Sequence, residues 1–340
     1  MPTIGRDVPE AAWRAFVDSV DGDLWYTPEW TRFLEQTFGY PRYHLFATGP
    51  DGVVTGFLPL FHVTSRITGD RLASAPFTHL CGPLGSMEDR AALVAAACRL
   101  REELGAGSLE IHDRVENSRF QGTSWFSTYI LELSPGPDAL RKRFSKNIQR
   151  GISQAGRMGV EVVRTRNPED IAHFYRMNLL HKKDLGILCH PRRFFDNLFA
   201  LLPEATTLYA ARYGGEIVAG SVILHHQGRY LYGYGAARAE SRDLPAQKQI
   251  LWEAIADACA AGGKTFDFGR VSQENEGLIR FKKSWGAEER KLTTSYYPAP
   301  GNRMGGRRDT RFFRLATAVI RSMPEPFFTR LSERYFGSFG

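Results

Sequence analysis

Acidic and basic side chains gather around a short aromatic segment in the last third of the chain. The segment FDFGR at 266–270 predicts a strand in which the two Phe share one face and Asp267 lies on the other. A carboxylate at that depth needs a partner, and Arg270, Lys282 and Lys283 follow closely. Asp267 is then a base or an orienter of a cationic site, or it is half of a structural ion pair. The pattern leaves these alternatives open.

Arg270 stands where that strand ends. Ligands of open α/β sheets sit at the carboxyl ends of the strands. A guanidinium group there suits a phosphate or a carboxylate, because it donates two parallel hydrogen bonds. We therefore expect Arg270 to bind an anionic part of a ligand, and we expect Lys283 to help bind substrate phosphate.

Three tyrosines alternate along a preceding strand-like segment, RYLYGYGAA at 229–237. The alternation predicts that Tyr230, Tyr232 and Tyr234 share one face. A tyrosine can protonate a leaving group or bind a phosphate oxygen, although packing in the core is the alternative. We assign Tyr234 the catalytic role and Tyr232 a binding role.

Gln247 and Lys248 open the helix that follows these tyrosines. The free N–H groups of a helix N-terminus bind anions. We expect both residues to assist in binding phosphate there.

Other chemistries find little support. Four cysteines lie far apart, with no CxxC pair, and His225–His226 has no acidic or cysteine companion at ligand spacing. Neither a nucleophile elbow nor a P-loop occurs. We expect no metal and no permanently bound cofactor.

The chain repeats itself, and the repeats position these residues. Residues 45–60 and 208–224 each read as a strand, a Gly turn and a strand. Residues 93–111 and 250–268 each read as an Ala-rich helix, a Gly stop and a short strand with one central acid. The two pairs keep nearly the same offset, which favours two copies of one fold over chance similarity of generic hairpins.

Ser, Pro and Gly cluster at 134–140 and mark a boundary. We expect an α/β protein with an N-terminal domain at 1–136, a second domain at 137–298 and a helical tail at 299–340. Each domain should hold a mixed sheet flanked by helices.

Composition indicates a globular chain with anionic partners. The 340 residues are 43% hydrophobic and carry a formal net charge of +7. One basic run covers 141–150 and another covers 303–314. Neither a signal peptide nor a membrane-spanning segment is visible, so we expect a cytoplasmic protein, with peripheral placement at the inner face of the membrane as an open alternative.

The tail carries apolar residues at helical spacing between 310 and 322, with arginines opposite. Such a helix can lie on an anionic membrane, here through 310–336, or it can pack on the parent domain. We expect its Phe-rich face to be at least partly open.

The pair FDFGR at 266–270 and FKKSWGA at 281–287 resembles the C-terminal signature of the FemAB-like family and of BioF2-like acetyltransferase domains, within the GNAT superfamily. WYTPEWTRFLEQTFG and GFLPLF in the first half resemble the family's opening helix and hairpin. The resemblance covers roughly residues 22–297. It implies two tandem GNAT-like (acyl-CoA N-acyltransferase) domains, with Lys282 near substrate phosphate or carboxylate groups. A solvent-exposed helix lysine is the alternative for Lys282.

The resemblance also implies an acyltransferase that moves an acyl or aminoacyl group to an amine. The donor would be acyl-CoA, an acyl-carrier thioester or aminoacyl-tRNA. The acceptor would be a phosphate-bearing or lipid-linked precursor of the cell envelope, peptidoglycan or a polysaccharide. The chain lacks the RxxGxA turn that holds CoA pyrophosphate in ordinary GNAT enzymes, since RAESRDLPAQ stands there. A small-molecule N-acetyltransferase using acetyl-CoA and a non-catalytic module that binds RNA or a phosphorylated glycan are the alternatives.

Overall fold

The computed structural model describes residues 2–241, 243–299 and 311–340, except for the side chains of 311–313. The basic residues expected between 303 and 308 and the side chain of Phe312 therefore lie outside the described residues. The chain divides into two compact units. Unit 1 holds 1–125, 291–307 and 337–340, and unit 2 holds 126–290 and 308–336.

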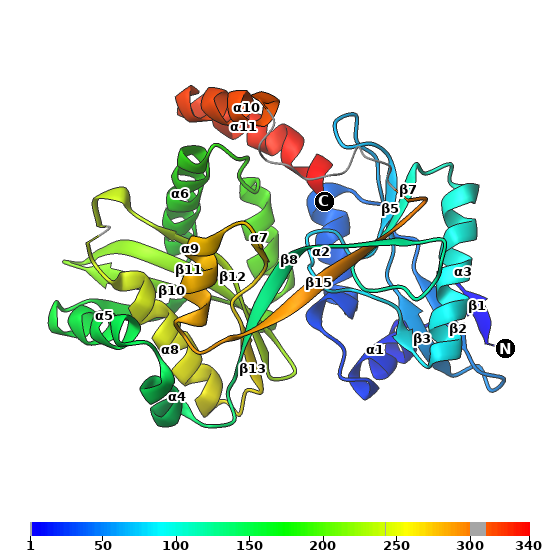
Figure 1. The fold of residues 1–340 in the computed structure, drawn as a ribbon, viewed down its shortest axis with the longest axis horizontal. Helices are drawn as coiled ribbons and strands as arrows, with labels where there is room; N and C mark the ends of the chain where they lie inside the picture. The colour runs from blue at the N-terminus through cyan, green and yellow to red at the C-terminus, as the bar shows by residue number, and fades with distance from the viewer. Residues whose placement is uncertain (1, 242, 300–310) are drawn as a thin grey trace. The chain divides into compact units, whose positions relative to one another are not determined.

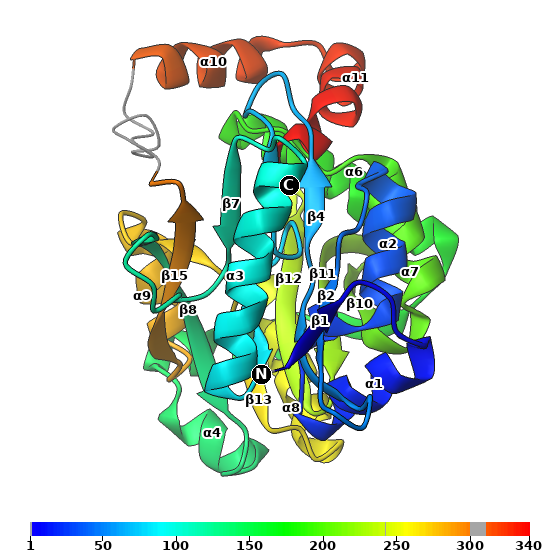
Figure 2. The ribbon, with the colours of Figure 1, turned by 90° about the vertical axis from the view of Figure 1, so that its right-hand side faces the viewer.

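Unit 1 combines short strands with three helices in its described part. Its elements are β1 (Thr3–Gly5), α1 (Glu10–Ser19), α2 (Pro28–Phe38), β2 (Leu45–Thr48), β3 (Val54–Leu58), β4 (Phe61–Val63), β5 (Arg71–Ala73), β6 (Leu84–Gly85), α3 (Met87–Glu103) and β7 (Ser108–Ile111), with the end of β15 (Glu288–Tyr297). The strands lie in the orders β1-β2-β3-β6 and β4-β5-β7-β15. Helix α3 runs alongside these strands (Figure 2) and buries Leu93 and Ala97 against them.

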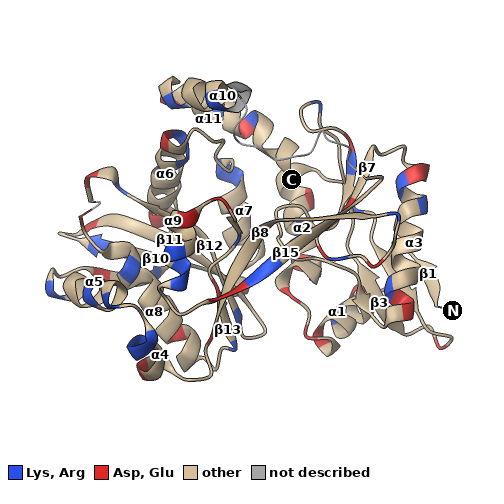
Figure 3. Ribbon diagram, in the orientation of Figure 1, with Lys and Arg blue, Asp and Glu red and all other residues tan. Residues whose placement is uncertain are grey.

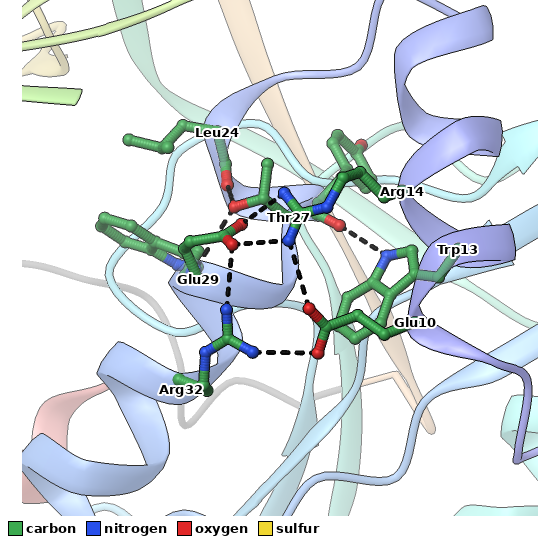
Figure 4. Close-up of polar contacts among 9 residues, drawn as sticks. Glu10, Trp13, Arg14, Leu24, Thr27, Glu29 and Arg32 are labelled. Atoms are coloured by element: carbon green, nitrogen blue, oxygen red, sulfur yellow. Dashed lines mark hydrogen bonds and ion pairs between the residues drawn. The ribbon is translucent and has the colours of Figure 1, made fainter. Parts of the chain in front are cut away.

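A network of ion pairs joins α1 and α2 of unit 1 (Figure 4). Arg14 contacts Glu29 at 2.6 Å and Glu10 at 3.1 Å. Arg32 contacts the same two carboxylates at 2.9 Å each. Beside this network, the buried indole N–H of Trp13 donates to the carbonyl of Tyr26 at 2.8 Å and joins α1 to the segment before α2.

Unit 2 is a mixed sheet covered by helices on both faces (Figure 1). Its elements are β8 (Gln121–Glu132, from residue 126), α4 (Pro137–Arg143), α5 (Lys146–Arg157), β9 (Glu161–Thr165), α6 (Pro168–Leu185), α7 (Arg192–Leu201), β10 (Thr206–Tyr213), β11 (Glu216–His226), β12 (Arg229–Ala237), α8 (Ala246–Ala260), β13 (Thr265–Asp267), β14 (Val271–Ser272), α9 (Glu276–Lys283), α10 (Arg311–Ser322) and α11 (Glu325–Tyr335). The strand order is β9-β10-β11-β12-β13-β8, with β14 on β8.

The two units share strand order, as the internal repeats predict. Each begins with antiparallel strands and then has one parallel pair, β5 with β7 or β12 with β13. A helix precedes the second strand of each pair, α3 or α8. Glu110 pairs with Ala73 in one unit and Asp267 pairs with Leu231 in the other, so the two central acids occupy equivalent positions.

Strands β8 and β15 are exchanged relative to chain order. Strand β8 follows the elements of unit 1, yet its residues 130–132 pair with β13. Strand β15 follows the elements of unit 2, yet its residues 295–297 pair with β7. The units therefore change at Trp125 and again at Arg290. The compact units therefore end at other residues than the repeats in the sequence predict. The predicted division at 136 and 298 stays a proposal.

Candidate active site

The parallel strands β12 and β13 part shortly after they begin. They pair from Arg229 with Thr265 to Leu231 with Asp267, and β12 then runs on to Ala237. The chain after β13 turns at Gly269, whose φ of +76° favours glycine. A Cβ at Gly269 would lie 3.0 Å from the carbonyl oxygen of Tyr232, so the turn favours a residue without a side chain. The parting leaves main-chain groups of β12 without a β13 partner.

Asp267 lies at this parting and receives two hydrogen bonds. The hydroxyl of Thr128 in β8 donates to its carboxylate, and the N–H of Gly269 donates at 2.7 Å. Phe266 and Phe268 point to the other face and are buried in the core, as strand alternation predicts. Both donors hold the same carboxylate oxygen of Asp267, so the side chain is fixed in place and is suited to orienting a neighbouring cation.

Lys282 in α9 is that cation. The residue is 5% exposed, and its ammonium group donates to the carbonyl oxygen of Gly269. Burial lowers the pKa of Lys282 to about 8, and the charge of Asp267 opposes that shift. The alternative of a solvent-exposed helix lysine is therefore wrong. At neutral pH Lys282 remains mostly charged, held beside Asp267 at the end of β13.

The three tyrosines of β12 do not share a face, contrary to the sequence-based prediction. Tyr232 pairs with Ile223 and Tyr234 pairs with Val222, so Gly233 has no partner in β11. This β-bulge inserts one residue and reverses the alternation beyond it. Tyr230 and Tyr232 pack with the α8 core, while Tyr234 lies on the opposite face.

Aromatic rings surround Tyr234 on that face. Its ring centroid lies 4.8 Å from that of His190, 5.4 Å from Phe194 and 5.3 Å from Phe195. Burial raises the pKa of Tyr234 far above its usual range, so the hydroxyl stays protonated at neutral pH. By strand alternation Asp267 shares this face, because Phe266 and Phe268 occupy the other one.

Comparisons with known proteins agree with this geometry. Residues 142–283 match the family model described as "Acetyltransferase (GNAT) domain". The match covers less than half of the chain and gives unit 2 a GNAT acyltransferase domain.

Three solved structures share the fold of this chain over most of their length. FemX superposes with a TM-score of 0.71 at 16% identity, covering 86% of this chain and 96% of FemX. The C-terminal domain of a putative lysylphosphatidylglycerol synthetase from Agrobacterium fabrum has a TM-score of 0.57 at 11% identity and coverages of 85% and 92%. A tandem GNAT protein from the clavulanic acid biosynthesis pathway has a TM-score of 0.50 at 12% identity and coverages of 81% and 89%. No curated protein sequence matches the chain.

The two residues expected to help bind phosphate lie in the first turn of helix α8. Its first turn has no acidic residue, and it presents Gln247 and Lys248. The equivalent helix of unit 1, α3, begins with Glu88 and Asp89, and Asp89 completes a capping box with Ser86. Acidic residues at a helix N-terminus repel a phosphate. The start of α8 therefore suits an anion better than the start of α3 does, and anion binding by Gln247 and Lys248 stays a prediction.

Gln247 and Tyr232 also bind each other. The amide of Gln247 donates to Ser221 at 2.5 Å and to the Tyr232 hydroxyl at 3.2 Å. Burial raises the pKa of Tyr232 to about 12. This polar set lies on the α8 face, away from Tyr234. Lys248 reaches Asn147 of α5 at 3.1 Å, and burial together with the charge of Arg150 lowers the pKa of Lys248.

Arg270 and Lys283 are exposed and lie over aromatic rings. The Arg270 guanidinium stands 4.4 Å from the ring centre of Phe126. Lys283 stands 5.9 Å from the ring centre of Tyr129 and 4.0 Å from the carboxylate of Glu289. The convergence of Arg270 and Lys282 on one ligand stays a prediction, as do all the assigned roles.

Two residues of the site escape sequence reasoning. Thr128 belongs to a strand that chain order assigns to the first repeat, and His190 lies in the loop between α6 and α7. Neither belongs to a motif, and a search for long-range strand pairing would be needed to find Thr128. Among the described residues, no group of three or more His, Cys, Asp or Glu side chains could hold a metal.

Proposed function

We propose that this GNAT acyltransferase transfers an acyl or aminoacyl group from an activated donor to an amine of a cell-envelope, peptidoglycan or polysaccharide precursor. The observation that carries the proposal is the buried Lys282, held by Gly269 and Asp267 where β12 and β13 part. A fixed positive charge in a dry site stabilises the oxyanion that forms as an amine attacks a carbonyl.

The reaction requires few groups. The neutral amine attacks the donor carbonyl, a C–N bond forms, and the bond to the thiol or ribose oxygen breaks. Lys282 and free N–H groups of β12 stabilise the oxyanion, and Asp267 keeps Lys282 oriented. Tyr234, which stays protonated, donates a proton to the leaving group and regains a proton from solvent afterwards. The proton lost by the amine passes to solvent.

The donor class follows from the surface beside α8. Lysine and arginine residues are frequent along α4 and α5 (Figure 3), and Lys142, Arg143, Lys146 and Arg150 are exposed there. Lys248 links this surface to the start of α8. An acyl thioester of CoA or of an acyl carrier, and an aminoacyl-tRNA, all bring phosphate groups to such a surface. One of the structural relatives is a putative lysylphosphatidylglycerol synthetase, which favours the aminoacyl donor.

The acceptor would approach near the end of β12. A cavity of about 350 Å³ opens there, lined by Met177, Leu180, His181, Asp184, Arg238 and Glu240 among others. The carboxylates of Asp184 and Glu240 favour a ligand that carries an amine. Arg238 forms an ion pair with Glu216, which balances its positive charge beside the cavity.

The tail supports a lipid-linked acceptor. Helix α10 covers the expected range, and Leu315 and Val319 on it are 64% and 50% exposed. Arg314 and Arg321 are exposed as well. Helix α11 packs by its buried Phe328 while Phe327 is 62% exposed. These exposed apolar and basic residues support peripheral binding to an anionic membrane as part of the proposal. No helix among the described residues has the length and apolar character needed to span a bilayer.

A second candidate is a small-molecule N-acetyltransferase that uses acetyl-CoA. The family model, which is described as an acetyltransferase domain, favours it. The glycine-free loop at 238–247 disfavours it, because close approach of a pyrophosphate to the backbone ordinarily needs glycine.

The test is a donor screen with intact-mass detection. The protein is incubated with acetyl-CoA or with aminoacyl-tRNA and a set of amine-bearing envelope precursors. We expect a mass gain on a precursor with aminoacyl-tRNA, lost in Lys282→Met and retained in Lys291→Met, which changes an exposed lysine with no assigned role. Transfer from acetyl-CoA to small amines alone would establish the second candidate. Binding of RNA or glycan without any transfer would leave the non-catalytic alternative.

A further inference from the structure

A buried arginine in unit 1 lies outside the proposed acyl-transfer site. Arg71 begins β5 and is 5% exposed. Its Nε lies 3.7 Å from the carboxylate of Glu110, and Oε1 of Glu110 has no hydrogen-bond partner among the described residues. A buried guanidinium has five donors to satisfy, and this single long ion pair leaves most of them for other acceptors.

Residues 337–340 of the same chain supply those acceptors. Arg71 donates to the carbonyl oxygens of Ser338, at 3.4 Å, and of Gly340. Thr68 donates to the same Ser338 carbonyl, and Tyr40 donates to the carbonyl of Gly337. Arg71 also donates to Thr68 at 2.7 Å, which fixes the hydroxyl in place. Three backbone carbonyls of this four-residue segment thus accept hydrogen bonds from side chains of unit 1.

An aromatic cradle limits what fits beside these donors. The rings of Phe38 and Phe77 lie 4.7 Å apart, and that of Tyr40 stacks on Phe38 at 5.2 Å. A Cβ at Gly340 would lie 2.9 Å from the Phe77 ring, which real side chains almost never do. Phe77 itself has a φ of +66°, an uncommon value for a bulky residue. The pocket therefore recognises backbone carbonyls and tolerates glycine at Gly340.

We propose that the pocket formed by Arg71, Thr68, Tyr40 and the Phe38–Phe77 rings is a binding site for a short peptide, and that residues 337–340 occupy it as an internal ligand. A peptide with consecutive carbonyls and a glycine at the position of Gly340 would compete with the segment. The inference goes beyond the proposed function and does not depend on acyl transfer. Since a tethered segment acts at a millimolar effective concentration, an external peptide should bind weakly until the segment is unseated.

The test uses the full chain with Gly340→Leu, which places a side chain against the Phe77 ring and should unseat the segment. The probe is the tetrapeptide Gly-Ser-Phe-Gly, acetylated at its amino end, titrated by calorimetry in amide and free-acid forms. We expect at least a tenfold tighter Kd for Gly340→Leu than for the unsubstituted chain. Tighter binding of the free acid than of the amide would mean that Arg71 reads a terminal carboxylate, and equal binding would mean that it reads carbonyls; either supports the site.

Arg71 decides whether that binding uses this pocket. In the Gly340→Leu background, Arg71→Gln should weaken the peptide by at least tenfold, and Arg66→Gln, on a nearby exposed arginine, should not. If Arg71→Gln unfolds the chain because Glu110 loses its cation, the pair Arg71→Gln and Glu110→Gln replaces it. Failure of a folded Gly340→Leu chain to bind either peptide, or binding indifferent to Arg71, would overturn the proposal. Transfer activity is not measured, so this failure would leave the proposed function intact.

Discussion

Lys282 donates a hydrogen bond from its ammonium group to the carbonyl oxygen of Gly269, thirteen residues earlier in the chain. The contact joins the end of α9 to the turn that follows β13, where Asp267 also binds the N–H of Gly269. A charged group thus lies buried at the point where two parallel strands part. Natural cores rarely keep an ammonium group without a use for its charge.

Replacing Lys282 by Met should abolish most activity while preserving the fold. Methionine keeps the length of the side chain, so it fills the space that alanine would leave empty. We expect kcat to fall about 100-fold, the usual loss when one donor to an oxyanion is removed. Lys291→Met is the matched control, because Lys291 is an exposed lysine of β15 with no role assigned in the site. Equal losses in both variants would contradict the assignment.

The stability of the protein should depend on pH through Lys282. Burial lowers its pKa from 10.5 in the unfolded chain to about 8 in the folded one. Between these values the unfolded chain binds more protons, so the contribution of this residue to stability rises with pH. Urea unfolding at about pH 7.5 and about pH 9.5 should show this rise relative to Lys282→Met. Parallel curves for the two proteins would mean that the pKa is not lowered.

Tyr234→Phe should reduce the rate without loosening the structure. The substitution keeps the ring against His190, Phe194 and Phe195 and removes the hydroxyl. Loss of a general acid costs about 100-fold or more, so kcat should fall by that factor and the melting temperature should stay constant. Tyr230→Phe, on the α8 face of the same strand, should leave kcat unchanged. A lowered melting temperature with normal kcat would identify Tyr234 as a packing residue.

Binding to membranes should depend on the exposed apolar residues of α10. Leu315→Ser with Val319→Ser removes the two most exposed large apolar side chains among the described side chains of α10. The unsubstituted chain should sediment with anionic vesicles and be released by salt, because Arg314 and Arg321 attract the surface. The double variant should sediment less. If neither protein binds the vesicles at low salt, the membrane proposal fails.

The ion-pair network of Figure 4 should stabilise unit 1 only above acidic pH. Burial raises the pKa of Glu29, but hydrogen bonding and the charge of Arg14 outweigh it, so the pKa ends below its usual value of 4.5. Stability from this group is therefore present above the unfolded pKa and is lost as pH falls through the folded one. Glu29→Gln should lower stability at neutral pH by at most about 1 kcal/mol. The difference should shrink as the pH falls below the unfolded value of 4.5 in urea titrations.

The local chemistry of the sequence determined several features of the protein. Alternation along FDFGR placed Phe266 and Phe268 in the core with Asp267 opposite, because a strand has a period of two. The hairpin and helix–strand repeats predicted two units with one strand order. The structure confirms this, because Glu110 in β7 and Asp267 in β13 occupy equivalent positions in their parallel strand pairs. Such patterns depend on neighbours along the chain, so they are visible before folding.

Tertiary structure decided the rest. The bulge at Gly233 moved Tyr234 to the face opposite Tyr232, because one unpaired residue reverses the alternation. Packing of α9 buried Lys282, and this burial lowered the pKa of its ammonium group. The exchange of β8 brought Thr128 to Asp267 across more than a hundred residues. Each outcome depends on which strand edges and helix faces meet, and that choice is made by the whole packed chain and not by any local run of residues.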